Sequence, residues 1–135
     1  MDQIKVVVHY KDGTVVKGHS QDFNPNRPFF HLHTESPGAP GNESLTIEMR
    51  ELKAVFFVKT FEGNKDYRKR NEFLPTDRPQ GKKVEVTFFD DEIIQGSTVG
   101  YDPQRQGFFL FPADGNSNNI RIFVVSSAVK NYRFL

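Results

Sequence analysis

The chain has 135 residues, 36% of them hydrophobic and 26% charged, and its formal net charge at pH 7 is +1. This length allows one ordinary domain or two very small ones, and the near-neutral charge excludes a global attraction to nucleic acid. The absence of cysteine excludes disulfides and thiolate metal sites, and no apolar run approaches the roughly 20 residues of a membrane helix. We therefore expect a cytoplasmic protein without a cofactor and without a membrane or DNA partner.

Two stretches of the chain repeat one another. Residues 5–23 read KVVVHYKDGTVVKGHSQDF, and residues 83–101 read KVEVTFFDDEIIQGSTVGY. Matching positions lie 78 residues apart (84 − 6 = 78), and a repeat without gaps predicts two copies of one small fold. We expect the copies over 1–61 and 82–135, joined by a polar linker over 62–81. The matching pairs are Val6 and Val84, Val8 and Val86, Tyr10 and Phe88, Asp12 and Asp90, Val15 and Ile93, Val16 and Ile94, and Gly18 and Gly96.

The first copy reads as a series of short strands. Residues 4–10 alternate with period two, which predicts a half-buried strand. Asp12-Gly13 then indicates a hairpin, because glycine accepts the positive φ that a tight turn demands. Gly18 inside the next strand indicates a sharp bend or a close backbone approach. The remaining strands of this copy are predicted over 15–23, 29–33, 45–49 and 52–61.

The second copy follows the same plan. It begins with a strand at Val84, bends at Gly96, and places Phe108 and Leu110 where the first copy has Phe30 and Leu32. Two further strands are predicted over 120–124 and 129–135.

Five short, strongly bent antiparallel strands per copy resemble the Sm-like barrel of the Sm and Lsm proteins. The motif that carries the resemblance is an apolar strand, Asp-Gly, four residues, Gly, and an aromatic-Asp pair five and six positions later. The first copy has Asp12, Gly13, Gly18 and Phe23 at this spacing, with Asn24 in place of the Asp.

The second copy has Gly96, Tyr101 and Asp102 at the motif spacing, and Asp91 stands where the turn glycine would be. The resemblance implies an all-β fold of two tandem five-stranded Sm-like barrels.

The resemblance also implies a site for single-stranded RNA. Sm proteins hold RNA with the aromatic-Asp pair, an Asn four residues later, and an Arg-Gly or Lys-Gly step in a second motif. This chain has Pro28 and Gln106 at the Asn positions and no basic-Gly pair at 49–52 or 125–128. A basic cluster in the linker could contact phosphate, although a solvated linker also explains it. The candidate RNA-binding residues are Phe23, Asn24, Tyr101, Asp102, Arg68, Lys69 and Arg70.

Apolar residues on both faces of several predicted strands indicate an interface. In a small barrel one face of each strand points inward, and residues of the opposite parity should be mostly polar. A surplus of apolar residues at outward positions indicates contact with another surface. That surface is either the other copy within the chain or a protein partner, including a second chain. The candidate interface residues are Phe56, Phe109, Phe111, Phe123 and Val125.

A dense polar loop precedes the fourth strand of the second copy. Short Asx side chains hydrogen-bond their own backbone in turns, which explains this composition without a ligand. The alternative is a recognition loop held by a rigid barrel. The residues concerned are Asp114, Asn116, Asn118, Asn119 and Arg121.

Two further patterns have weaker support. His31 and His33 share one face of a predicted strand, but zinc would need a third ligand, and we predict no metal site. Residues 95–100 (QGSTVG) resemble, one residue short, the Asp/Asn-x-Ser-x-x-Gly motif of PilZ domains, which bind cyclic di-GMP. Gln95 departs from that motif, so cyclic-dinucleotide binding remains an alternative.

No pattern in the sequence favours an enzyme. There is no Ser-His-acid ordering with a nucleophile elbow, no phosphate-cradling Gly-rich loop before a helix, and no pair of carboxylates in an apolar setting. We therefore predict a non-catalytic binding or adaptor module that contacts a protein partner or self-associates. Sm-type binding of single-stranded RNA is the alternative function.

Overall fold

The computed structural model describes residues 4–34, 44–61, 73, 81–99, 104–114 and 118–135. Within these residues the fold is all-β, as predicted, with two three-residue 3-10 helices, η1 (Met49–Glu51) and η2 (Ser126–Ala128). No helix in these ranges is long and apolar enough to cross a membrane. The strands are β1 (Ile4–Tyr10), β2 (Val15–Ser20), β3 (Phe29–Thr34), β4 (Ser44–Glu48), β5 (Leu52–Val58), β6 (Lys82–Phe88), β7 (Ile93–Thr98), β8 (Gly107–Pro112), β9 (Asn119–Val125) and β10 (Val129–Phe134).

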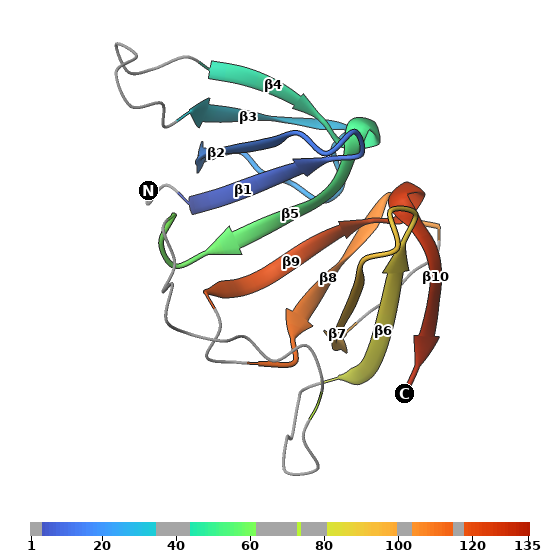
Figure 1. Ribbon diagram of the computed structural model, residues 1–135. Coiled ribbons are helices and arrows are strands. Elements are labelled where there is room, and N and C mark those ends of the chain that lie inside the picture. Colours follow the sequence, from blue (N-terminus) through green and yellow to red (C-terminus); the bar gives the residue numbers. More distant parts are fainter. Residues whose placement is uncertain (1–3, 35–43, 62–72, 74–80, 100–103, 115–117) are drawn as a thin grey trace.

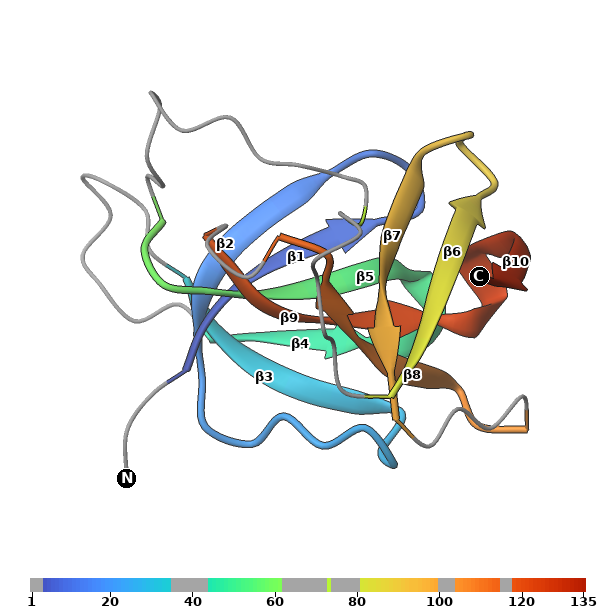
Figure 2. The ribbon, with the colours of Figure 1, turned by 90° about the horizontal axis from the view of Figure 1, so that it is seen from below.

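All ten strands belong to one antiparallel sheet, in the order β10-β6-β7-β8-β9-β5-β1-β2-β3-β4. The first half of the chain (β1 to β5 with η1) and the second half (β6 to β10 with η2) connect their strands in the same order. Pairing of β5 with β9 joins the halves, and Figure 1 shows these two strands side by side in the middle. Seen from below in Figure 2, β6, β7 and β10 lie on the opposite side of the molecule from β3.

The first hairpin of each half closes in the same way. The carboxylate of Asp12 accepts the N–H of Thr14 at 2.9 Å, and that of Asp90 accepts the N–H of Glu92 at 3.1 Å. A short Asx side chain stabilises a tight turn through such a bond. The residue after each aspartate has a positive φ, +94° at Gly13 and +72° at Asp91. The Asp-Gly turn is therefore reproduced in the second half with aspartate in the glycine position.

Gly18 and Gly96 occupy matching places in the β1–β2 and β6–β7 pairs. A Cβ on Gly18 would clash with the carbonyl oxygen of His33, and one on Gly96 would clash with that of Phe111. A neighbouring backbone therefore occupies the space that a side chain would need, so these glycines serve the close backbone approach.

The central strands β5 and β9 contribute to two hydrophobic cores. Every residue of β5 is buried, and its alternate residues Ala54, Phe56 and Val58 enter the second core. From β9, Phe123 and Val125 enter the first core. Each core is thus completed by a strand from the other half. The first core also contains Val6, Val8, Phe30, Leu32, Ile47, Met49, Leu52, Val55 and Phe57; the second also contains Val84, Val86, Phe88, Ile94, Phe108, Leu110, Ile122, Val124 and Ala128.

Several strands end earlier than the sequence indicates. The second strand was expected to reach residue 23 and ends at Ser20, and the fifth was expected to reach residue 61 and ends at Val58. Beyond Val58, the N–H of Lys59 donates to the carbonyl oxygen of Asn118 at 3.0 Å. Met49, expected on the fourth strand, begins η1, and its N–H still donates to the Pro28 carbonyl oxygen at 2.8 Å next to the β3–β4 pair.

Candidate functional site

The candidate RNA-binding residues in the described ranges take part in the fold. The ring of Phe23 is half-buried, and its centroid lies 5.1 Å from those of Phe30 and Phe57. A ring held edge-on against the core differs from the exposed platform on which bases stack. The side chain of Asn24 accepts the N–H of Asn26 at 2.9 Å in an Asx turn. The other candidates lie outside the described residues: Tyr101, Asp102, Arg68, Lys69 and Arg70.

Three of the five candidate interface residues are buried. Phe56, Phe123 and Val125 are 7%, 0% and 2% exposed. Phe109 is partly buried against the first core. Contact between the halves, one of the two alternatives, accounts for the burial of these residues. Phe111 is 41% exposed and stays on the surface.

Asn118 and Asn119 from the candidate recognition loop hold the two halves together. The side-chain carbonyl of Asn118 accepts the N–H of Thr60 at 3.1 Å, and its amide donates to the Thr60 carbonyl at 2.8 Å. Asn119 lies opposite Val58 in the β5–β9 ladder. The amide of Asn118 thus extends the central strand pair by bonding the other half, a role that neither interpretation of this loop included.

Arg121 lies against aromatic rings in the same region. Its guanidinium carbon is 4.6 Å from the ring centroid of Phe57 and 4.2 Å from that of Phe109, which is cation–π geometry. Burial lowers the pKa of this guanidinium. Asp114 is 1% exposed, and Asn116 lies outside the described residues.

The histidines of β3 make local contacts. His31 Nδ1 lies 2.6 Å from the carboxylate of Asp22, which also accepts the His31 N–H at 2.9 Å. Burial opposes ionisation of Asp22, but these hydrogen bonds outweigh it and lower the pKa. His33 lies opposite His19 in the β2–β3 pair. Over the ranges that the structure covers, no group of three or more His, Asp or Glu side chains could hold a metal ion.

A nearly buried lysine connects β5 with the first turn of the second half. Lys53 is 9% exposed, and its Nζ lies 2.7 Å from Asp90 Oδ2, pairs with Glu92, and stands 4.8 Å from the ring centroid of Phe88. Burial opposes the charge on Lys53, but the hydrogen bonds to both carboxylates raise its pKa. The hydrogen bond from Lys53 also lowers the pKa of Asp90.

Two other side chains span the halves. Lys11 Nζ donates to the Arg50 carbonyl oxygen and to Ser127 Oγ, both at 2.7 Å. Gln106, at one of the Sm Asn positions, donates through Nε2 to the carbonyl oxygens of Pro25 and Arg27, both at 2.6 Å. Polar contacts thus reinforce the β5–β9 pairing at the end where η1 and η2 lie.

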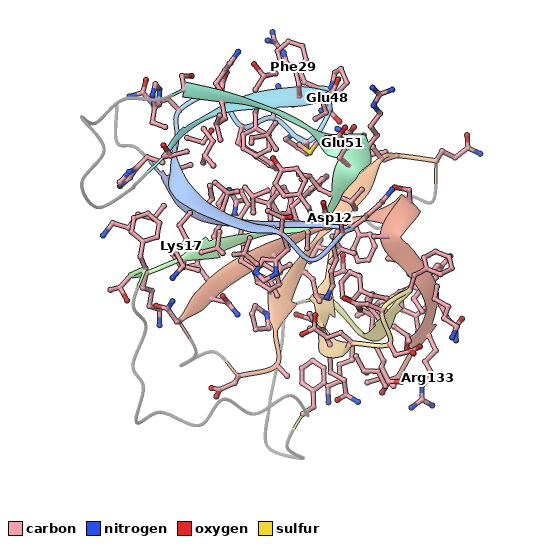
Figure 3. The ribbon with its side chains drawn as sticks, turned by 45° about the horizontal axis from the view of Figure 1, so that its top comes forward. Asp12, Lys17, Phe29, Glu48, Glu51 and Arg133 are labelled. Carbon is pink, nitrogen blue, oxygen red and sulfur yellow. The ribbon has the colours of Figure 1, made fainter. Side chains whose placement is uncertain are left out.

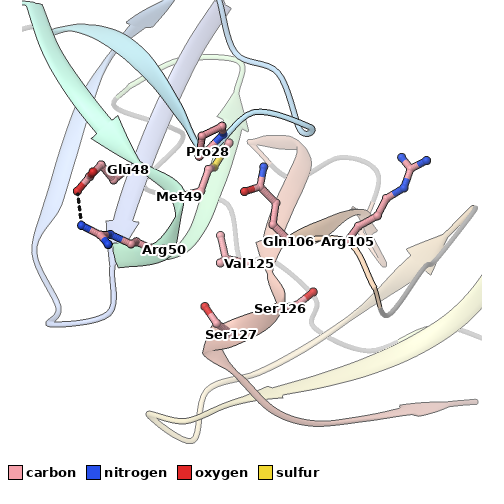
Figure 4. Close-up of a pocket in the computed structure, with 9 residues that line it drawn as sticks. All are labelled: Pro28, Glu48, Met49, Arg50, Arg105, Gln106, Val125, Ser126 and Ser127. Carbon is pink, nitrogen blue, oxygen red and sulfur yellow. Dashed lines mark hydrogen bonds and ion pairs between the residues drawn. The ribbon is translucent and has the colours of Figure 1, made fainter.

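A cavity of about 510 Å³ opens between the halves at this end, and we call it the junction cavity. Figure 4 shows Arg50 and Arg105 on opposite sides of it, with Val125 and Ser126 between them. The buried Oγ of Ser126 has no hydrogen-bond partner among the described residues. The lining residues are Pro28, Glu48, Met49, Arg50, Arg105, Gln106, Val125, Ser126 and Ser127.

The outer strand β10 differs from β5, its counterpart in the first half. Among the described strands, β10 pairs only with β6, and it is exposed at every position from Lys130 onward. Tyr132 is 39% and Phe134 is 49% exposed, and their ring centroids lie 6.2 Å apart. A second cavity of about 400 Å³ lies beside β10, lined by Phe108, Ser126, Val129, Lys130, Asn131 and Tyr132.

The roles of Lys53, Gln106 and β10 were not predicted from the sequence. One available signal was that the last strands of the two copies differ in their content of apolar residues. Residues 52–58 (LKAVFFV) are apolar on both faces, whereas three of the six residues of 129–134 (VKNYRF) are polar. That contrast indicates that only the first of the two strands is enclosed on both sides.

A family model matches residues 2–135, nearly the whole chain, and it describes a family of unknown function, DUF6982. No curated protein and no solved structure matches the chain.

Proposed function

The chain belongs to DUF6982, a family of unknown function, and we propose that it is a non-catalytic binding module that captures an extended strand of a partner protein. The docking site is the outer edge of β10, the last strand of the described sheet. The observation that carries this proposal is the contrast between two equivalent strands, one buried on both faces and one exposed. The sequence-based expectation of a cytoplasmic location belongs to the same proposal.

We further propose that each half is one Sm-like barrel. The resemblance in the turn and glycine positions supports this, and so does the strand order shared by the two halves. On this interpretation the two barrels share their central strands, because β5 and β9 contribute side chains to both cores.

Among the described strands, β10 has one neighbour, whereas β5 has two. Val6 and Val84 are matching positions of the two copies, and Val6 lies opposite Phe57 of β5 whereas Val84 lies opposite Phe134 of β10. Phe57 and Phe134 are therefore equivalent, and positions in β5 and β10 correspond at an offset of 77 (134 − 57 = 77). Phe57 is 1% exposed because β9 covers it, whereas Phe134 is 49% exposed. An added strand would bury this aromatic surface and form main-chain hydrogen bonds, which is β-strand addition.

A second copy of this chain is a poor occupant of that edge. The outer strand at the opposite end of the described sheet is β4. β4 in the first half corresponds to β9 in the second half, again at an offset of 77, because η1 begins at Met49 and η2 at Ser126 (126 − 49 = 77). Where β9 presents Phe123 and Val125, β4 presents Thr46 and Glu48. Polar side chains would then face the rings of β10. Figure 3 shows Glu48 and Arg133 at the two far ends of the sheet.

A strand with apolar residues at alternate positions fits the edge better. The cavity beside β10 has apolar walls at Phe108 and Val129 and could receive one side chain of the added strand. In β-strand addition such pockets give specificity, while the main-chain bonds give affinity. We therefore propose a segment of another protein as the occupant.

The test uses two synthetic peptides with identical lysine flanks. One has the sequence of β9 (NIRIFVV), which pairs with β5 in this fold, and the other has the sequence of β4 (SLTIE). We expect the β9 peptide to bind with a Kd of about 10–100 μM and the β4 peptide at least tenfold more weakly. Hydrogen exchange should show new protection over residues 129–134.

Two variants test whether the β9 peptide binds at β10. Tyr132→Lys should abolish binding of the β9 peptide, whereas Phe111→Lys, a change at an equally exposed ring on β8, should leave it intact. Thermal unfolding checks that both variants fold. Equal affinity for the two peptides, or loss of binding in Phe111→Lys alone, would overturn the proposal. A dimer detected by light scattering that Tyr132→Lys disrupts would assign the edge to a second copy instead.

A further inference from the structure

We propose that the junction cavity binds a small phosphate monoester that carries a flat apolar group. This site adjoins the cavity beside β10, with which it shares Ser126, but the inference does not depend on the proposed partner strand. The inference rests on the shape of the cavity, the charges around it, an unpartnered hydroxyl group and an apolar wall.

The cavity exists only because the two halves pair. Met49 and Arg50 reach it from η1 in the first half, and Gln106, Val125 and Ser126 reach it from the second half. Gln106 is held by two short hydrogen bonds to the first half, so this wall is fixed in position. A volume of about 510 Å³ falls within the range of small-molecule sites.

The charges around the cavity favour an anion. Its lining has two cations, Arg50 and Arg105, and one acid, Glu48, which gives a net charge of +1 (2 − 1). Glu48 lies 3.5 Å from the guanidinium of Arg50, and both side chains of this pair are exposed enough for Arg50 to exchange the carboxylate for a ligand anion. The ammonium group of Lys11 contacts Ser127 Oγ in the lining and adds a second positive charge. The lining together with Lys11 is therefore net positive.

Hydroxyl groups lie beside these cations. Ser127 Oγ accepts a hydrogen bond from Lys11, and its own proton can therefore be donated elsewhere. Ser126 Oγ is buried without a partner, at a wall that the junction cavity shares with the cavity beside β10. A buried hydroxyl without a partner is destabilising, and a ligand oxygen would satisfy it.

The apolar part of the cavity lining favours a ligand with an apolar group beside its phosphate. Pro28, Met49 and Val125 are apolar, and a thioether makes favourable contacts with aromatic rings. Phosphate oxygens accept both from an arginine fork and from hydroxyl groups. A phosphate monoester of a flat organic group would use both parts of the site, whereas inorganic phosphate or a simple carboxylate would use only one.

The experiment is a calorimetric titration of the full-length protein with phenyl phosphate, inorganic phosphate and benzoate at low salt. We expect phenyl phosphate to bind at least fivefold more tightly than either of the other two. Arg50→Gln and Ser126→Ala should each weaken phenyl phosphate binding about tenfold, since each removes a hydrogen bond to a charged group. Glu48→Gln should strengthen it, because it removes the one acid in the lining.

Lys17→Gln is the matched control, because it removes an exposed cation on β2 outside the lining, and the affinity should then stay within about twofold. Thermal unfolding confirms that each variant folds. Equal affinity for the three anions, or phenyl phosphate binding that ignores both Arg50→Gln and Ser126→Ala, would overturn the site. Tighter Arg50-dependent binding of a short A-rich RNA than of phenyl phosphate would overturn its assignment to a small ligand.

Discussion

At the scale of single residues, one turn position distinguishes the two halves. Gly13 and Asp91 both have a positive φ, a conformation that is unstrained for glycine and unfavourable for a residue with a Cβ. Asp91 has one compensating contact, to Lys130 Nζ at 3.3 Å, and both side chains are more than half exposed. Exposed pairs of this kind contribute little to stability.

We therefore expect Asp91→Gly to raise the free energy of unfolding by roughly 0.5–1 kcal/mol, since relief of backbone strain exceeds the lost ion pair. Urea denaturation of the two proteins measures the difference. The reciprocal variant Gly13→Asp should be destabilised by a similar amount. Destabilisation by Asp91→Gly would show that the Lys130 contact outweighs the strain.

The glycines within strands make a different prediction. Gly96 lies against the backbone of Phe111, so Gly96→Ala should lower the free energy of unfolding by about 3 kcal/mol through overpacking. Nothing lies within 4 Å of a Cβ at Gly13, and Gly13→Ala should lower it by only about 1 kcal/mol, from φ strain alone. Chemical denaturation distinguishes the two. Equal losses would contradict the close approach at Gly96.

At the scale of elements, equivalent lysines on β5 and β10 have different environments. Lys53 is buried between two carboxylates, whereas Lys130 is exposed and pairs with the exposed Asp91. Lys53→Met keeps the apolar stem and removes the charge, so we expect a loss of about 1 kcal/mol in unfolding free energy. Lys130→Met should change it by less than about 0.5 kcal/mol. Similar effects from both variants would show that the Lys53 cluster adds nothing.

The same cluster predicts a dependence of stability on pH. The pKa of Asp90 is lowered, chiefly by the hydrogen bond from Lys53. The ionised Asp90 therefore stabilises the folded state above the unfolded pKa of about 4, and this stabilisation is lost as pH falls through the lower folded pKa. The pKa of Lys53 is raised, so its contribution is present below the ordinary value of 10.5 and is lost at higher pH. Urea midpoints measured from pH 7 down to 3 should fall less in Lys53→Met than in the parent. Parallel curves would contradict this assignment.

At the scale of the whole molecule, the two halves share both cores. Phe123 belongs to the second half but is fully buried in the first core, and Phe56 belongs to the first half but lies in the second core. Removing either half would expose apolar surface in the other. The predicted division at residues 61 and 82 therefore falls between segments that complete one another.

We expect residues 1–61 and 82–135, produced separately, to show no cooperative thermal unfolding, and an equimolar mixture to recover it. In the intact chain, Phe123→Ala should lower the free energy of unfolding by about 3–5 kcal/mol and keep a single transition. Circular dichroism and calorimetry measure both results. A first half that unfolds cooperatively alone with full stability would contradict the shared cores.

The sequence by itself determined the local structure of this protein. Alternation at residues 4–10, the turns at Asp12 and Asp90, and the matching glycines each act over a few neighbouring residues, so their pattern is readable along the chain. The all-β class and the similar connection of strands in the two halves follow from that pattern. Surplus apolar residues such as Phe56 and Phe123 also indicated a contact, with its location left open.

Only the tertiary structure decided where the apolar faces of the two halves meet. The pairing of β5 with β9 joins strands more than sixty residues apart (119 − 58 = 61), and no local rule selects one edge partner over another. That pairing buries Lys53 beside Asp90, stacks Arg121 on two rings, forms the junction cavity, and leaves β10 as a free edge. The candidate binding sites depend on contacts between distant segments, and for that reason the sequence alone could not locate them.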